Sequence, residues 1–308
     1  MKELKPNVGL SRLCWLFGVT RQAYYQSFYR EGFLQIEEEL IIKEVITIRE
    51  KHPRMGTRKL YLTLESFLFE HQIKIGRDGF FNLLSQYHLL IRTRKRTVRT
   101  TQSHHWLKKY PNLIKDFAPT APDQLYVSDI TYWRIDTGFV YISLITDAYS
   151  HKIVGYNLAQ TLEAVECLYA LKMALLSIKK GIGLIHHSDR GVQYCSTKYV
   201  NLLEKYSIEI SMTQDSDPRE NAIAERVNGI IKGEYLECYS VANFAQAEEL
   251  LNAVVKLYNK ERPHMSIGNL FPEKVHNMEI EKGEKKWKNY YQKKMDLNQN
   301  VIDLEGEK

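Results

Sequence analysis

The sequence predicts an α/β fold, in which a mixed sheet carries helices on both faces and a helical region precedes it. After Gln124, three short runs rich in β-branched and aromatic residues follow one another: LYVSDITYWRI, GFVYISLITDAY and HKIVGYNLA. Segments with helical spacing then alternate with short apolar runs, which gives the order β-β-β-α-β-α-β-α. Three consecutive strands predict a meander, and the alternation that follows predicts a mixed sheet between two layers of helices.

The first 91 residues are expected to form a helical DNA-binding region. Apolar residues recur at helical spacing over 11–26 and 36–51, without a sustained heptad. Two further helices are predicted around the turn HQIKIGRD, the second capped by Asp78. Their expected apolar faces are Leu60, Leu64, Phe67 and Leu68 after Gly56, and Phe81, Leu84, Tyr87 and His88 after the turn. This pattern is typical of a helix-turn-helix, although generic three-helix packing produces the same spacing.

Residues 92–122 have no apolar periodicity and are expected to form an extended basic linker. The wider segment 51–120 holds 14 Lys and Arg against 4 Asp and Glu. Such a concentration of positive charge suits a segment that binds a polyanion, and a solvated basic face is the alternative. The residues expected to contact DNA phosphates here are Arg92, Arg94, Lys95 and Arg96.

Composition places the chain among globular proteins. With 308 residues, 44% of them hydrophobic, it can bury one large or two moderate cores. No apolar run is long enough to span a bilayer, so a cytoplasmic location is expected. The four cysteines lie far apart without metal-ligand spacing, which favours reduced thiols over a zinc site or disulfides. The polar tail over 278–308 is expected to be loosely held.

Three carboxylates carry the chemical prediction. Asp129 lies within an apolar strand, on the face that also carries Leu125, Val127, Thr131 and Trp133. Asp189 ends the apolar run GLIHHSD, and Glu225 lies within the helical run NAIAERVNGIIKGEY. A buried carboxylate is costly unless it is compensated, and a divalent metal is the simplest compensation. Three acids that converge on divalent metal can cut and rejoin phosphodiester bonds.

The helix that carries Glu225 has a polar stripe, formed by Asn221, Glu225, Asn228 and Lys232. The stripe would face the cleft while Ile223, Val227, Ile230 and Ile231 face the core. An ordinary amphipathic helix explains this pattern equally well. His187 could approach a phosphate from the strand that leads to Asp189, or it could be a packing histidine. For Arg262 and His264, a structural role after the last helix is favoured over a phosphate contact.

Four ordered motifs, VSDITYW, HHSDRGVQY, ENAIAERVNGIIKGEY and YNKERPH, closely resemble the B-frame transposases of the large insertion-sequence family encoded in two overlapping frames. These transposases share their catalytic core with retroviral integrases. The resemblance implies a ribonuclease H-like core, here over 123–277, in which Asp129, Asp189 and Glu225 bind two Mg²⁺ or Mn²⁺ ions. It also implies that Lys232 is the basic residue that follows the glutamate, and that Arg190 lies at the edge of the site.

The expected activity is cleavage at the ends of an insertion sequence and transfer of the resulting 3′-OH to target DNA. A nuclease or resolvase that only hydrolyses DNA, and a non-catalytic DNA-binding protein with the same fold, are the alternatives. DNA contacts within the core are expected from Lys232, His187, Arg190 and Asn221. Because two element ends must be brought together, at least a homodimer is expected. The family's A-frame portion, with its own helix-turn-helix and leucine zipper, is not recognisable here, which makes an A-frame protein a candidate partner.

Overall fold

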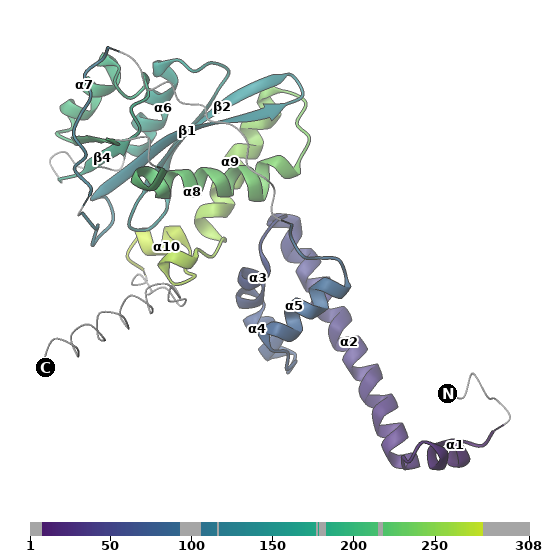
Figure 1. The fold of residues 1–308 in the computed structure, drawn as a ribbon. Helices are drawn as coiled ribbons and strands as arrows, with labels where there is room; N and C mark the ends of the chain where they lie inside the picture. Colours follow the sequence, from purple (N-terminus) through teal and green to yellow (C-terminus); the bar gives the residue numbers. More distant parts are fainter. Residues whose placement is uncertain are drawn as a thin grey trace, which may run out of the picture. The chain divides into compact units, whose positions relative to one another are not determined.

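The computed structural model describes residues 8–92, 106–115, 117–176, 178, 183–214 and 218–279. The chain divides into two compact units (Figure 1). The first comprises residues up to 93 apart from 52–54, and the second comprises 52–54 with the chain from 94 onward. None of the helices in the described ranges is both long enough and apolar enough to cross a membrane. All four cysteines are free thiols, in agreement with the prediction.

All the regular secondary structure in the described residues of the first unit is helical. Its helices are α1 Leu10–Leu16, α2 Arg21–Lys51, α3 Thr57–Thr63, α4 Glu65–Glu70 and α5 Arg77–Gln86. The prediction of separate helices over 11–26 and 36–51 is wrong, because α2 runs without a break through the intervening residues. Gly32 is the only strong helix breaker between them, and one glycine costs a helix only about 1 kcal/mol.

The C-terminal part of α2 packs with α3, α4 and α5 into one core. The core residues are Ile41, Ile42, Val45, Met55, Leu60, Leu64, Leu68, Ile73, Phe80, Leu83 and Leu84. The face predicted for α5 was displaced, because Phe80 and Leu83 are buried whereas Tyr87 and His88 lie beyond the helix end and are exposed. The predicted Asp78 cap is also wrong, since Gly76 occupies the N-cap and Asp78 pairs with Arg77.

The second unit contains a five-stranded mixed sheet. Its strands are β1 Leu125–Ile135, β2 Gly138–Asp147, β3 Ile153–Ala159, β4 Ile185–Ser188 and β5 Glu209–Met212. The order across the sheet is β3-β2-β1-β4-β5. The first three strands form the predicted antiparallel meander, and β4 and β5 extend it in parallel from β1.

Helices cover both faces of this sheet, as predicted (Figure 1). The helices are α6 Ala164–Ala174, α7 Thr197–Lys205, α8 Ala222–Ile230, α9 Phe244–Lys260 and α10 Pro272–His276. On one face, α6 and α7 pack against residues that include Ile145 and Ile210. On the other face, α8 and α9 pack against Trp133, Ile142 and Leu144. The sheet is therefore the central layer, and β1 is its middle strand.

Part of the predicted linker packs on the second unit. Leu107 and Tyr110 contact the core on the α6–α7 face. The backbone N–H of Met212 donates to the carbonyl of Pro111 at 3.1 Å, and the N–H of Leu113 donates to Ser211 Oγ at 2.9 Å. Residues 111–113 thus lie beside β5.

Candidate active site

Strand pairing brings Asp129 and Asp189 to neighbouring positions. In the parallel pair of β1 and β4, Ser128 lies opposite Ser188, and each aspartate is the next residue of its chain. Neighbouring strands lie about 4.8 Å apart. The predicted alternation of side chains along β1 is confirmed. Val127 and Trp133, which share a face of β1 with Asp129, both pack toward α8. Asp129 therefore faces the helix that carries Glu225.

The three predicted acids interact electrostatically. The pKa of Asp129 is raised to about 7, chiefly because burial disfavours its charged form and then because Asp189 carries a like charge. The charge of Glu225 raises this pKa further, while hydrogen bonds from Asn228 and from the backbone of Ile130 lower it. The structure thus brings Asp189 and Glu225 within electrostatic range of Asp129.

Two asparagine side chains attach α8 to β1 at Ser128 and Asp129. Asn221 donates from Nδ2 to the carbonyl oxygen of Ser128 at 3.0 Å, and Asn228 donates from Nδ2 to Asp129 Oδ2 at 2.8 Å. Both side chains are buried. Asn221 and Asn228 of the polar stripe therefore lie against β1, and the DNA contact of Asn221 stays a prediction. The spacing of the stripe was visible in the sequence, but its partner strand was not.

Asp189 lies at a tight turn directly after β4. Its Oδ1 accepts a hydrogen bond from the N–H of Gly191 at 3.0 Å. A Cβ atom at residue 191 would stand 3.0 Å from the same oxygen, so a side chain there would crowd the carboxylate. Arg190, between them, is half-buried. The turn fixes the direction of the Asp189 carboxylate.

Lys232 lies in a wider helical turn than the sequence predicted. The α-helix ends at Ile230, and a π-helical segment, Ile231–Tyr235, follows it. The Lys232 ammonium lies 3.8 Å from the centre of the Tyr132 ring, on β1. Burial lowers the pKa of Lys232, and the nearby charge of Glu237 opposes this. Lys232 is consequently half-buried against an aromatic ring.

His187 takes the packing role. It is fully buried in β4, and a hydrogen bond of 2.8 Å joins its Nδ1 to Ser211 Oγ on β5. Burial lowers its pKa to about 4. The neighbouring His186 is also buried, and a 3.0 Å hydrogen bond joins its Nε2 to the hydroxyl of Tyr199. Both histidines are neutral parts of the core at physiological pH.

Arg262 and His264 have the structural role that the sequence favoured. Arg262 is 1% exposed and makes a two-pronged contact with Glu234, with Nε–Oε2 and Nη2–Oε1 distances of 2.8 and 2.9 Å. His264 stacks on His151 with ring centres 4.4 Å apart. These contacts join the end of α9 to the π-helical segment and to the β2–β3 turn.

Of the predicted basic contacts before the core, Arg92 is described, and its side chain is exposed in the first unit. Arg94, Lys95 and Arg96 lie outside the described residues.

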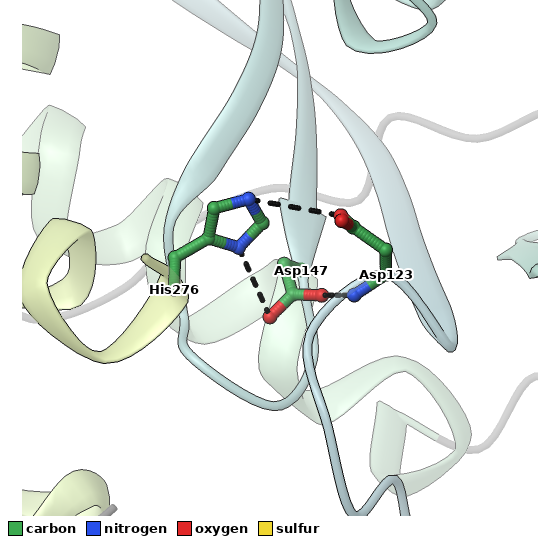
Figure 2. A group of neighbouring side chains, drawn as sticks. All are labelled: Asp123, Asp147 and His276. Atoms are coloured by element: carbon green, nitrogen blue, oxygen red, sulfur yellow. Dashed lines mark hydrogen bonds and ion pairs between the residues drawn. The ribbon is translucent and has the colours of Figure 1, made fainter. Parts of the chain in front are cut away.

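A second polar cluster, which the sequence did not suggest, joins α10 to the sheet (Figure 2). Within the described ranges, Asp123, Asp147 and His276 are the one trio of potential metal ligands whose atoms all lie within 4.8 Å of one another. The two nitrogens of His276 face different acids, with Nε2 3.6 Å from Asp123 Oδ1 and Nδ1 3.8 Å from Asp147 Oδ1. A single ion could use only one of these nitrogens.

Other groups of the protein donate hydrogen bonds to both acids of this cluster. Asp147 Oδ1 accepts hydrogen bonds from the N–H and hydroxyl of Ser150, and its Oδ2 accepts from the N–H of Asp123. Asp123 Oδ1 accepts from the hydroxyl of Tyr126 at 2.6 Å. Burial raises the pKa of Asp147, but the hydrogen bonds from His276 and Ser150 outweigh burial and lower it. The cluster is a hydrogen-bonded latch between α10 and the sheet.

Asp129, Asp189 and Glu225 differ from this latch because they have a surplus of negative charge. Their mutual repulsion contributes to the raised pKa of Asp129, so added positive charge would favour the fully ionised state. Carboxylate oxygens are the ligands that Mg²⁺ and Mn²⁺ prefer. The residues present therefore fit divalent metal.

The sequence matches two family models, both described as an integrase core domain, over residues 119–218 and 206–272. A 31 kDa protein of insertion element IS600 from Shigella sonnei is 35% identical over 86% of this chain and 99% of its own length. A putative transposase for insertion sequence element IS986/IS6110 from Mycobacterium tuberculosis is 30% identical, over 70% of this chain and 79% of its own. Among solved structures, the HTLV-2 integrase catalytic core domain in complex with magnesium is 18% identical, with a TM-score of 0.41, over 52% of this chain and 99% of its own.

Proposed function

Because the chain belongs to the insertion-sequence transposases that carry an integrase core domain, we propose that it cleaves the ends of an insertion sequence and transfers them to target DNA, with Asp129, Asp189 and Glu225 as its catalytic, metal-binding acids. The two matched segments together span the whole sheet and the helices α6 to α9. All three acids lie within the matched residues.

One observation carries the assignment of the acids. Burial, together with the charges of Asp189 and Glu225 from 60 and 96 positions further along the sequence, raises the pKa of Asp129 to about 7. A fold that needed these side chains only for stability would gain nothing from placing two like charges near one buried carboxylate. Perturbed acids on a central strand are typical of functional sites.

Two Mg²⁺ or Mn²⁺ ions bound to these acids would activate the attacking hydroxyl and stabilise the leaving oxygen of the phosphodiester. The chain's own residues supply the frame. Asn228 orients Asp129 through the 2.8 Å hydrogen bond, and the Gly191 N–H orients Asp189. Asn221 attaches the start of α8, the helix that carries Glu225, to β1.

DNA would be held by the basic residues around and before this frame. Candidate contacts within the core are Lys232, on the π-helical segment, and Arg190, on the turn after β4. Arg92, Arg94, Lys95 and Arg96 belong to the most basic run of the sequence and would contact phosphates without reading bases. Two copies of the chain would bring two element ends together, and an A-frame protein is a candidate partner in recognising those ends.

The test compares Asp129→Asn and Glu225→Gln with wild type on a pre-cut element end and on an uncut end, in Mg²⁺ and in Mn²⁺. Each change keeps the side-chain volume and removes one negative charge. We expect cleavage and joining to be lost in both variants while DNA binding persists. Glu248→Gln on α9, an exposed acid, is the matched control and should retain full activity. Full activity in either site variant would disprove the assignment, and cleavage without joining by wild type would instead indicate a hydrolytic nuclease.

A further inference from the structure

Tyr194 is a buried tyrosine on the turn that follows β4 and Asp189. Its side chain is only 2% exposed and lies in the core on the α6–α7 face of the sheet. A buried hydroxyl needs a hydrogen-bond partner, and a bond of 3.0 Å joins the Tyr194 hydroxyl to that of Ser128 on β1. Ser128 is the residue immediately before Asp129. This bond, the hydroxyl tether, therefore connects the turn after one acid with the strand position before another.

The proton of the hydroxyl tether comes from Tyr194. The carbonyl oxygen of Leu144, on β2, also lies within hydrogen-bond distance of Ser128 Oγ, at 3.3 Å. A serine hydroxyl has one proton, so both bonds form together only when Ser128 donates to this carbonyl and accepts from Tyr194. Burial raises the pKa of Tyr194 well above its ordinary value, and the negative charges of Asp189 and Asp129 are among the groups that add to the shift. Tyr194 thus keeps the proton that the tether needs.

A short series of contacts leads from Tyr194 back to the Asp189 carboxylate. The backbone N–H of Tyr194 donates to the carbonyl of Gly191 at 3.1 Å, and the N–H of Gly191 donates to Asp189 Oδ1 at 3.0 Å. The Tyr194 ring also lies against this glycine, since a Cβ atom added at residue 191 would stand 3.6 Å from Tyr194 Cδ2. Because the ring, the glycine and the carboxylate are in contact one after another, a shift of the ring would be passed on to the carboxylate.

Two connections therefore join the positions of Asp129 and Asp189. The first is the pairing of β1 with β4, whose last pair is Ser128 with Ser188. Asp189 lies one residue beyond this pair, so strand pairing alone does not fix its backbone. The second connection is the hydroxyl tether, which holds the turn after Asp189 to β1 from the α6–α7 face. Asp129 itself points to the opposite face of β1, so the tether acts on the pair without touching a metal or substrate.

We propose that Tyr194 is a positioning residue, which sets the separation of Asp129 and Asp189 through Ser128 and thereby selects the size of the divalent ion that the two acids bind. The inference rests on the proposed function, because it requires both acids to be metal ligands. Mg²⁺ demands near-octahedral geometry with oxygen ligands at about 2.0–2.1 Å, whereas Ca²⁺ accepts flexible geometry at about 2.3–2.6 Å. Without the tether, repulsion between the like charges would move the acids apart, which weakens the binding of Mg²⁺ more than that of Ca²⁺.

The test measures the affinity of the full chain for Mg²⁺ and for Ca²⁺, from the rise in melting temperature as each ion is added to metal-free protein. Asp189→Asn, which removes a proposed ligand, shows how much of the rise comes from ions bound elsewhere. We expect Tyr194→Phe, which keeps the ring and removes the hydroxyl, to lower the affinity for Mg²⁺ by about 10-fold, the low end for groups that orient a metal ligand. The affinity for Ca²⁺ should fall much less. Ser128→Ala should have a similar effect, and the combined variant should add little, because both changes break the same bond.

Tyr258→Phe is the matched control, because it removes a buried hydroxyl of the same kind away from the acids. The Tyr258 hydroxyl donates to the carbonyl of His151 at 3.0 Å, and its residue lies on α9, on the opposite face of the sheet.

Both tyrosine variants should lower the melting temperature of the metal-free protein, but only Tyr194→Phe should change the ratio of the Mg²⁺ and Ca²⁺ affinities. An unchanged ratio in Tyr194→Phe, or an equal change in Tyr258→Phe, would overturn the inference and leave the proposed function standing. If Asp189→Asn binds Mg²⁺ as tightly as wild type does, the assignment of the acids fails, and the inference fails with it.

Discussion

Asn228 donates a hydrogen bond from its Nδ2 to Asp129 Oδ2 across the gap between α8 and β1, at 2.8 Å. This bond lowers the pKa of Asp129, whereas burial and the neighbouring acids raise it. It is the described side-chain contact that favours the charged form of the central acid.

Replacing Asn228 by Leu should therefore shift the pH dependence of strand transfer. Without the donor, the pKa of Asp129 should rise above about 7, so that less of the acid is ionised at neutral pH. A hydrogen bond to a charged group contributes about 1.5–3 kcal/mol, which corresponds to roughly a 10- to 100-fold loss of activity at pH 7. Activity should partly recover at pH 8.5. Asn221→Leu is the control, because Asn221 binds the Ser128 carbonyl, and it should lose stability without a shift in the pH profile. An unshifted profile in Asn228→Leu would contradict the orienting role.

Lys232→Ala should reduce strand transfer far more than it reduces stability. Its cation–π contact with Tyr132 contributes about 0.5–1 kcal/mol, whereas a lost phosphate contact in the site affects catalysis directly. Tyr132→Leu is the informative partner variant, because it removes the same cation–π contact but keeps the ammonium. We expect Lys232→Arg and Tyr132→Leu to retain much of the activity that Lys232→Ala loses. Equal activity losses in Lys232→Ala and Tyr132→Leu would show that Lys232 acts only by packing.

Neutralising Arg92, Arg94, Lys95 and Arg96 together should flatten the salt dependence of DNA binding. Each duplex phosphate contact contributes roughly −0.9 to the log–log slope, so up to about 3.6 could be lost. Affinity should fall alike for all sequences, because phosphate contacts do not read bases. The control replaces Lys198 and Lys205, two exposed lysines of α7, by alanine. A slope that stays the same in the four-residue variant would indicate a solvated basic face.

The stability of the second unit should fall steeply in mild acid. Burial lowers the pKa of His186 to about 3 and that of His187 to about 4. Because these pKa values are lowered in the folded protein, the histidines of the unfolded chain take up protons first as the pH falls. The contribution of the two neutral histidines to the free energy of unfolding is therefore fully present above about pH 6.5, and it is lost as the pH falls toward 4 and 3. The two histidines together give a slope of up to about 2.7 kcal/mol per pH unit.

Asp129 has the opposite effect in metal-free protein. Its raised pKa favours the folded state at low pH, and this contribution is lost as the pH rises from about 4 to about 7. One acid should offset only about half of the two histidine contributions. Urea unfolding between pH 7.5 and 4.5 in the presence of a chelator measures the sum. A stability that does not fall below pH 6.5 would contradict the assignment of both histidines as buried and neutral.

Removal of Arg262 should destabilise the second unit through the charge that it leaves behind. Arg262→Met leaves Glu234, only 20% exposed in its side chain, without its guanidinium partner, and breaking such a pair costs about 3–5 kcal/mol. Arg262→Met combined with Glu234→Met should recover most of this stability. Arg77→Met, which breaks an exposed pair with Asp78, should change stability by less than about 1 kcal/mol. A small effect of Arg262→Met in urea unfolding would mean that Glu234 finds other compensation.

Local patterns in the sequence were enough to predict the sheet and the direction of the Asp129 side chain. Strand alternation placed Asp129 with Val127 and Trp133, and both pack toward α8 in the structure. The polar stripe on α8 was also visible. What the sequence could not show was its partner, because the contacts of Asn221 and Asn228 join residues more than 90 positions apart.

Two helical features were missed for different reasons. The continuity of α2 was missed because Gly32, a poor helix former, lies between the two predicted segments, although a single glycine does not end a helix. The π-helical segment was missed because no residue type specifies it, and it moves Lys232 from the predicted helix face to the ring of Tyr132. The latch of Asp123, Asp147 and His276 could not be expected either, since it closes only when α10 reaches the sheet.

The parallel pairing of β1 with β4 also has a consequence for the protein during its own synthesis. Asp129 emerges from the ribosome well before Asp189, and Glu225 emerges last. At about 5–20 residues per second, roughly 5–20 s pass between the first acid and the third. Pairing of β4 with β1 must also wait for the whole of β2, β3 and α6. A nascent chain therefore has no assembled acid cluster until α8 has been made.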